Sequence, residues 1–151
     1  YVHDEAAAFQ GGVSGNAGLF SNANDLAKVL QMLLNNGAYG GERYLSEETV
    51  RLFTQTKSPT CRRGLGFDKP SIGSKASPCG ALAPASVYGH TGFTGTCFWV
   101  DPDHQLIYIF LCNRIYPSRT NTKLSSLDIR TRIQDAIYKS LADYPSQPHK
   151  D

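Results

Sequence analysis

Apolar residues recur every three or four positions in two stretches of the first 60 residues, which is the spacing of one face of an α-helix. The first stretch follows Ser21, a residue type suited to an N-cap, and stops at Gly37; its apolar positions are Leu26, Val29, Leu30, Leu33 and Leu34. The second follows Ser46 and runs from about Glu47 to Gln55, with two acidic residues in its first turn, where the helix dipole favours them. Residues 1–60 are therefore predicted to form a helical layer.

The strongest strand signal lies in residues 87–113. Residues 94–100 are rich in β-forming residues, and residues 106–112 are an unbroken apolar run, which is typical of a strand buried on both faces. We predict a core hairpin over 87–113 that closes around Asp101-Pro102-Asp103-His104. One face should be covered by the helix near 22–36 and the other by a C-terminal helix over 125–142.

The predicted C-terminal helix has an apolar stripe. Ile133, Ile137 and Leu141 are expected to face the sheet, joined at the start by Leu127 and Ile129, while Arg130, Arg132, Gln134 and Lys139 are expected to face water. Residues 61–86, rich in Pro, Gly and Ser, should form a long irregular connection with a short strand near Arg63–Phe67, and loops of this length are often functional. The sequence thus predicts an α+β fold, an antiparallel sheet flanked by helices, over residues 1–144, with a polar tail at 145–151.

Composition excludes several classes of partner. The 151 residues suit one modest domain, with 40% apolar residues, 19% charged residues and a net charge of only +2. Lys and Arg are scattered among acidic residues, so we expect neither nucleic acid nor an anionic membrane as a partner. No stretch reaches the roughly 18 apolar residues of a membrane span. The first residues lack a signal-peptide pattern and an initiator Met, so we expect the chain to begin inside a longer protein.

Four cysteines, at positions 61, 79, 97 and 112, match neither a metal-binding spacing nor a CxxC pair, so no metal or cofactor is expected. In the predicted hairpin Cys97 falls opposite about Tyr108 and Cys112 opposite about Phe93, too far apart for a disulfide. Both are expected to be buried as small apolar residues. Cys61 and Cys79 lie in the loop-rich region and would either pair, if the protein is exported, or remain reduced.

The candidate chemistry lies in a small polar motif, Gly89-His90-Thr91-Gly92-Phe93-Thr94-Gly95, within the predicted hairpin. Serine β-lactamases and penicillin-binding proteins carry Lys-Thr-Gly on the strand that borders the active site, and His often replaces that Lys in esterase-like and class C-like relatives. Two further blocks match in order: a Gly-rich stretch at residues 11–21 before the Leu-rich helix, and Trp99-Val100-Asp101-Pro102 before an apolar strand that ends in Asn113-Arg114. Over roughly residues 1–140 the chain resembles the C-terminal part of a serine β-lactamase-like, penicillin-binding hydrolase, with part of the β-lactamase/transpeptidase-like fold.

This resemblance implies acyl transfer, in which a serine attacks a carbonyl and preorganised N–H groups stabilise the oxyanion. By resemblance, the backbone N–H of Phe93 is one oxyanion donor, Gly92 lets the substrate backbone approach, Thr91 offers its hydroxyl, and His90 hydrogen-bonds the polar end of the substrate or the proton-transfer network. Histidine has an unperturbed pKa of about 6.5, so anchoring of a substrate carboxylate should be weaker than with lysine and pH-dependent. The substrate would be a small molecule or derived from peptidoglycan, and the parent a bacterial protein of the periplasm or otherwise exported.

The nucleophile of the family stands in a Ser-x-x-Lys motif and its assisting tyrosine in a Tyr-x-Asn motif, and this sequence contains neither. The nucleophile is therefore expected outside this chain. The resemblance implies that the longer parent is a serine hydrolase working through an acyl-enzyme, whereas the isolated chain should be inactive. An exposed sheet edge should associate with the missing N-terminal half of the domain or with a second copy of the chain.

Other interpretations remain. His90 would also suit a surface turn, and Gly92 and Gly95 would also suit a bulge without a functional role. The glycines between residues 11 and 18 do not indicate a phosphate loop, because no strand precedes them and no Gly-Lys-Ser/Thr follows. The parent could carry this segment as a non-catalytic, penicillin-binding-like module fused to a cell-wall N-acetylglucosaminidase. A structural or interaction domain is favoured if the Phe93 N–H is held in a ladder hydrogen bond with no cleft before it.

Overall fold

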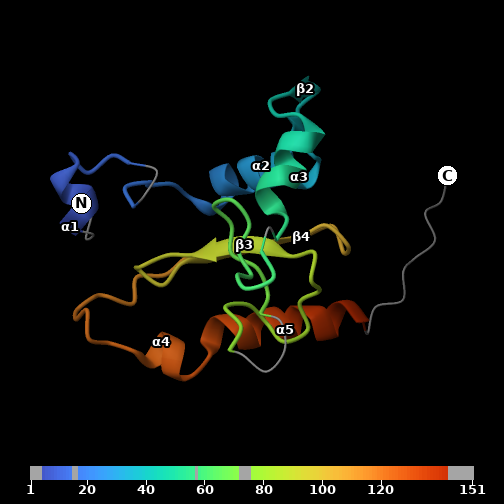
Figure 1. The fold of residues 1–151 in the computed structure, drawn as a ribbon. Coiled ribbons are helices and arrows are strands. Elements are labelled where there is room, and N and C mark those ends of the chain that lie inside the picture. Colours follow the sequence, from blue (N-terminus) through green and yellow to red (C-terminus); the bar gives the residue numbers. More distant parts are fainter. Residues whose placement is uncertain (1–4, 15–16, 57, 72–75, 143–151) are drawn as a thin grey trace.

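The computed structural model describes residues 5–14, 17–56, 58–71 and 76–142. Its centre is a three-stranded antiparallel sheet in the order β3-β4-β5, formed by Tyr88–Thr91, Cys97–Asp101 and Leu106–Phe110. The helices are α1 (Glu5–Phe9), α2 (Ala23–Leu34), α3 (Glu47–Thr54), α4 (Lys123–Ser126) and α5 (Ile129–Ala142). This confirms the predicted α+β class (Figure 1). Within the described ranges no helix is long and apolar enough to span a membrane. The predicted tail at 145–151 lies outside the described residues.

Local sequence sets the ends of the two N-terminal helices. The N-cap of α2 is Asn22 rather than Ser21, because the Asn22 side chain accepts a hydrogen bond from the Asp25 N–H at 3.1 Å. At the other end, the Gly37 N–H donates to the Met32 carbonyl and Asn36 takes the left-handed conformation with φ 53°, which is a Schellman ending. Ser46 caps α3 as predicted, since its hydroxyl accepts from the Thr49 N–H at 3.0 Å.

The helical layer also contains a small hairpin that the sequence pattern did not predict. Strands β1 (Ala38–Tyr39) and β2 (Glu42–Arg43) pair in antiparallel fashion around Gly40 and Gly41, which both have positive φ. Such short strands give no periodic signal, and only the glycine pair could have indicated a turn.

The predicted single hairpin over 87–113 is wrong in one respect: its first strand is two strands, β3 and β4, separated by a turn at residues 92–96. The register of β4 and β5 also differs by two positions from the prediction, because Cys97 faces Phe110 and Trp99 faces Tyr108. Cys112 therefore lies two positions from the residue opposite Cys97, closer than expected. All four cysteines are nevertheless free thiols in the structure, including Cys61 and Cys79.

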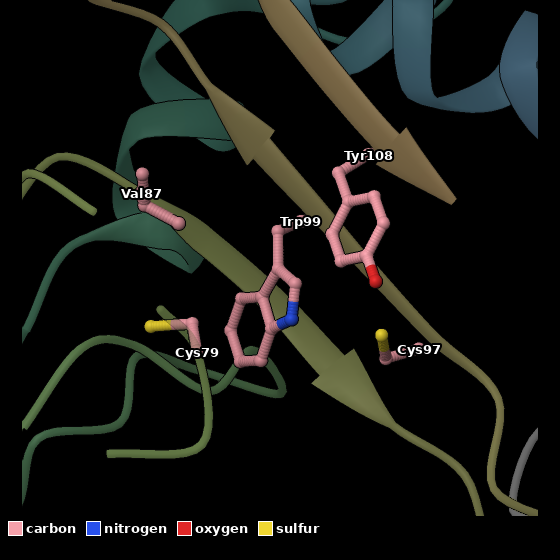
Figure 2. Close-up of a cluster of buried hydrophobic side chains, with 5 residues drawn as sticks. All are labelled: Cys79, Val87, Cys97, Trp99 and Tyr108. Carbon is pink, nitrogen blue, oxygen red and sulfur yellow. The ribbon is translucent and has the colours of Figure 1, made fainter. Parts of the chain in front are cut away.

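Helices cover both faces of the sheet, as the unbroken apolar run of β5 predicts. On one face α2 contacts β4 and β5 and buries Leu30 and Leu34 against Tyr88 and Val100. On the other face, toward α5, a second cluster surrounds Trp99, which is 1% exposed (Figure 1). Figure 2 shows the Trp99 indole with Cys79 and Val87 on one side and Cys97 and Tyr108 on the other.

The buried face of the C-terminal helix differs from the predicted stripe. The helix begins at Ile129 because Asp128, with φ 51°, separates it from α4. Its buried residues are Gln134 and Tyr138, while Ile133 is 37% exposed; Leu127 and Leu141 are exposed too, and Ile137 packs against the Trp99 cluster. Gln134 is inside because its side-chain oxygen accepts the Gly80 N–H at 2.8 Å. A buried donor of the loop region thus places a polar side chain where periodicity predicted an exposed one.

Candidate active-site edge

The loop-rich segment anchors β3. No strand forms at residues 63–67; instead Asp68 makes an isolated bridge to Gly89 through two hydrogen bonds, Asp68 N–H to Gly89 O at 2.7 Å and Gly89 N–H to Asp68 O at 3.0 Å. Burial would raise the pKa of Asp68, but hydrogen bonds from Arg62 and from the Lys69 N–H hold it below its usual value. A Cβ on Gly89 would collide with the Phe98 carbonyl oxygen and approach the Trp99 ring at 2.7 Å. Glycine at this position therefore lets β3 pack closely on β4.

His90 and Thr91 are the last two residues of β3. They pair with Phe98 and Cys97 of β4, and because side chains alternate along a strand, they point to opposite faces of the sheet. The His90 Nδ1 atom lies 2.7 Å from the Thr91 carbonyl oxygen. Since a carbonyl can only accept, the neutral imidazole carries its proton on Nδ1 and leaves Nε2 as an acceptor.

The outer edge of β3 changes from paired to open along the strand. The backbone N–H and C=O groups of successive residues point to opposite edges of an antiparallel strand, so residues two apart point to the same edge. Gly89 uses its outward N–H and C=O on Asp68, so the Thr91 N–H, two residues later, points to the same outer edge. Beyond the Asp68 bridge, no further strand pairs with this edge among the described residues.

The turn after β3 has an uneven hydrogen-bond pattern. Its closing bonds are Gly92 N–H to Thr96 O at 2.7 Å and Gly95 N–H to Gly92 O at 3.0 Å, and Gly95 supplies the positive φ of 101° that the turn requires. The N–H groups of Phe93 and Thr94 make no hydrogen bond to any residue that the structure describes. The Phe93 N–H is therefore not held in a ladder bond, and it is available to a ligand.

Two arginines bind the carbonyl groups of this turn. Arg114 donates from Nε to the Phe93 carbonyl at 3.0 Å and from its backbone N–H to the Thr94 carbonyl at 2.9 Å. Arg130, at the start of α5, donates from Nη1 to the Gly95 carbonyl at 3.2 Å. The prediction that Arg130 faces water is wrong for this reason.

The Phe93 ring, 43% exposed, carries two guanidinium groups. Arg114 and Arg119 lie with their Cζ atoms 5.3 and 5.4 Å from the ring centroid, within the range of a cation–π contact. Arg119 also pairs with Glu5 of α1 at 3.1 Å, although both side chains are more than half exposed. The ring lies on the surface beside the open edge of β3, with these guanidinium groups over it.

The candidate site is a strand edge, and two hollows among the described residues lie elsewhere. A groove of about 1000 Å³ lies near the opposite end of β3, where Tyr88, Lys69 and α3 contribute to its walls. A smaller hollow of about 290 Å³ lies against Cys112 and α4. Neither includes the predicted site residues. Among the described residues no group of three or more His, Cys, Asp and Glu side chains could hold a metal ion.

The structure thus places the four consecutive predicted residues, His90, Thr91, Gly92 and Phe93, at the end of β3 and the start of its turn. Sequence reasoning missed Arg114 and Arg130 as contacts of this edge. Asn113-Arg114 was visible only as the end of a matching block, and nothing in the sequence connects Arg130 with a turn 35 residues earlier.

The arrangement of sheet and helices has a counterpart among solved structures. A beta-lactamase from Mycobacterium bovis superposes with a TM-score of 0.63 at 24% identity, over 82% of this chain and 46% of that chain. At this identity the likeness concerns the fold alone. The sheet and helices therefore form part of a β-lactamase-like fold.

Sequence comparison identifies the family. The beta-lactamase family model matches residues 1–130, so this chain belongs to the beta-lactamase family. A putative D-alanyl-D-alanine carboxypeptidase of Escherichia coli O157:H7 is 42% identical over 114 residues, which are 75% of this chain. One of Salmonella paratyphi B is 39% identical over 125 residues. The chain spans 26% and 29% of the length of these two relatives.

Proposed function

We propose that this chain supplies the substrate-binding strand edge and one oxyanion N–H of a serine hydrolase whose nucleophile lies outside residues 1–151. The observation that carries the proposal is the change along β3 from a paired edge at Gly89 to open N–H groups at Thr91 and Phe93. An extended acyl substrate could pair with this edge as an added strand. The Phe93 N–H would then meet the oxygen on which negative charge develops.

The substrate class that fits best is a peptide ending in D-alanyl-D-alanine. This choice follows the names of the relatives, putative D-alanyl-D-alanine carboxypeptidases, and the edge suits an extended peptide. Nε2 of His90 would accept a hydrogen bond from a substrate amide or a catalytic hydroxyl when neutral, and would donate to a carboxylate when protonated. A β-lactam or an ester is the alternative acyl group for the same edge.

We also propose pairing partners for the second open edge of the sheet. Strand β5 forms the other edge of the sheet, without a further strand among the described residues. Unpaired strand edges recruit partners, so we propose that this edge pairs with the N-terminal half of the parent domain and, in the isolated chain, with a second copy. A peptidoglycan substrate would place the protein in an exported, cell-wall compartment.

Labelling with a fluorescent penicillin and with a fluorophosphonate tests the proposal. Both probes are applied to this chain and to the full-length protein, with denatured protein as the control for non-specific reaction. The proposal expects labelling of the full-length protein only. Absence of label on both would favour the non-catalytic module, and label on this chain alone would place a nucleophile within it and overturn the proposal.

A further inference from the structure

We infer that Arg114 and Arg130 are positioning residues that hold the carbonyl groups of the 92–96 turn inward and thereby fix the Phe93 N–H toward the open edge. This inference rests on the proposed function, in which that N–H stabilises the oxyanion. Neither arginine would contact the substrate. Their effect would pass through the backbone of the turn.

The first observation is that every carbonyl of the turn has a donor. Gly92 O accepts from the Gly95 N–H, and Thr96 O accepts from the Gly92 N–H. The three carbonyls between them have no partner within the turn. These three carbonyls accept hydrogen bonds from outside the turn. Phe93 O accepts from the Arg114 side chain, Thr94 O from the Arg114 backbone N–H, and Gly95 O from the Arg130 side chain.

The second observation is how Arg114 is held in turn. Its Nη1 atom donates to the carbonyls of Arg119 and Asn121, at 3.4 and 3.3 Å, and its stem approaches Gly95 so closely that a Cβ there would lie 3.2 Å from Arg114 Cγ. A planar guanidinium can satisfy several carbonyls in fixed directions, which an ammonium on a flexible stem cannot do. Arg114 therefore links the segment after β5 rigidly to the turn before β4.

The consequence for the site concerns the orientation of one peptide plane and its neighbours. The peptide groups of the turn are planar, so binding a carbonyl on one side directs the following N–H to the other side. With Phe93 O held by Arg114, the Thr94 N–H points away from that arginine. The Phe93 N–H shares its peptide plane with the Gly92 carbonyl, which accepts from the Gly95 N–H at 3.0 Å. The arginines would therefore act on the Phe93 N–H indirectly, by holding the turn that makes this bond. Preorganised donors are effective in catalysis because they need no reorientation when charge develops.

Arg119 provides a matched comparison within the same surface. It lies over the Phe93 ring at nearly the same distance as Arg114, but its side chain makes no hydrogen bond to the turn among the described residues. Loss of Arg119 removes one ring contact and one exposed ion pair. Loss of the Arg114 side chain removes a ring contact, the bond to the Phe93 carbonyl and the two bonds to the carbonyls of Arg119 and Asn121.

The test uses the full-length protein with Arg114→Met, Arg114→Lys, Arg130→Met and the control Arg119→Met. We expect Arg114→Met to lower kcat roughly 10- to 100-fold with little change in KM. Complete loss of an oxyanion donor costs about 10²- to 10³-fold in rate, and a displaced donor should cost less. Arg114→Lys, which keeps the charge without the planar fork, should restore only part of this loss. Arg130→Met should have a smaller effect of the same kind, and Arg119→Met should stay near the wild-type rate.

Amide hydrogen exchange on the same proteins separates this inference from the proposed function. The Gly95 N–H, which closes the turn, should exchange faster in Arg114→Met than in Arg119→Met, whether or not the protein turns over a substrate. If the wild-type protein is inactive, the proposed function fails while faster exchange still supports the clamp. Equal exchange at Gly95 in the two variants, or an active Arg114→Met protein with wild-type kcat, would overturn the inference.

Discussion

The two turns of the central sheet differ in which backbone groups find partners inside the protein. In the turn between β4 and β5, a buried carboxylate satisfies the donors: Asp101, 1% exposed, accepts from the N–H groups of Asp103 and His104 at 2.9 and 3.2 Å. It also accepts from the His104 ring at 2.8 Å and from the Tyr138 hydroxyl at 2.6 Å. In the turn between β3 and β4, side chains satisfy the acceptors instead, and two N–H groups stay open.

This difference gives two hairpin turns of the same sheet a different capacity to bind a ligand. A turn whose donors are bound by its own carboxylate has little left to offer a ligand, and Asp101 ties it to α5 through Tyr138. A turn whose carbonyls are bound from behind offers N–H groups, and adjacent N–H groups form a site for an anion. The first turn is a structural connection, and the second has the polarity that an oxyanion site needs.

The largest expected effect comes from removing the carboxylate that binds the N–H groups of the turn between β4 and β5. Asp101→Ala should lower the free energy of unfolding by about 3–4 kcal/mol, because it leaves buried donors, including the Tyr138 hydroxyl, without an acceptor. Urea unfolding can be followed by the fluorescence of Trp99, the one tryptophan of the chain. The exposed neighbour Asp103, bonded to Ser86, is the control, and Asp103→Ala should cost less than about 1 kcal/mol. Equal losses in the two variants would contradict the structural role of Asp101.

The next largest effect is expected in the turn between β3 and β4, whose carbonyl groups are bound by arginines. Gly95→Ala combines a positive φ of 101° with a Cβ only 2.6 Å from Leu124 Cδ2 and 2.7 Å from Cys112 Sγ, so we expect a loss of about 3 kcal/mol. Gly66 has a similar φ of 96° but open space around the added Cβ, so Gly66→Ala should cost only about 1 kcal/mol. Thermal unfolding of both variants measures the difference. Similar midpoints for the two would mean that the turn is not packed as described.

The smallest effect concerns the link from the first turn to α5. Tyr138→Phe removes the hydrogen bond to Asp101 and should cost about 2 kcal/mol near neutral pH. Burial, and to a smaller extent the bond to Asp101, raises the pKa of Tyr138 above its usual value of about 10. A tyrosine whose pKa is raised in the folded state contributes its full stability below the pKa of the unfolded chain. This contribution is lost as the pH rises from the unfolded pKa through the folded pKa. The stabilities of wild type and Tyr138→Phe should therefore converge above about pH 10, and a constant difference would argue against a raised pKa of Tyr138.

Local patterns predicted those elements that local residues determine. Ser46 caps its helix with its own hydroxyl, and the apolar run of β5 is covered on both faces as its composition requires. The turn at residues 92–96 was missed because β-forming residues continue on both sides of it. The predicted register of β4 and β5 was then wrong because it assumed a single long strand in place of β3 and β4.

The remaining misses are contacts between distant residues. Gln134 is buried by a loop N–H 54 positions earlier, and Arg130 turns inward to a carbonyl 35 positions earlier. Helical periodicity contains neither partner, so it assigned both side chains to water. The motif from His90 to Phe93 could be found from the sequence because its residues are consecutive, whereas the arginine behind it could not.

The central claim is that the Phe93 N–H faces the reacting oxygen, and its amide resonance tests this most directly. Full-length protein labelled with ¹⁵N-phenylalanine would be compared before and after reaction with a boronic acid that forms a tetrahedral adduct, with Phe93→Leu identifying the signal. We expect a downfield shift and slower exchange of the Phe93 amide in the adduct. An unchanged Phe93 amide in a protein that does form the adduct would contradict it.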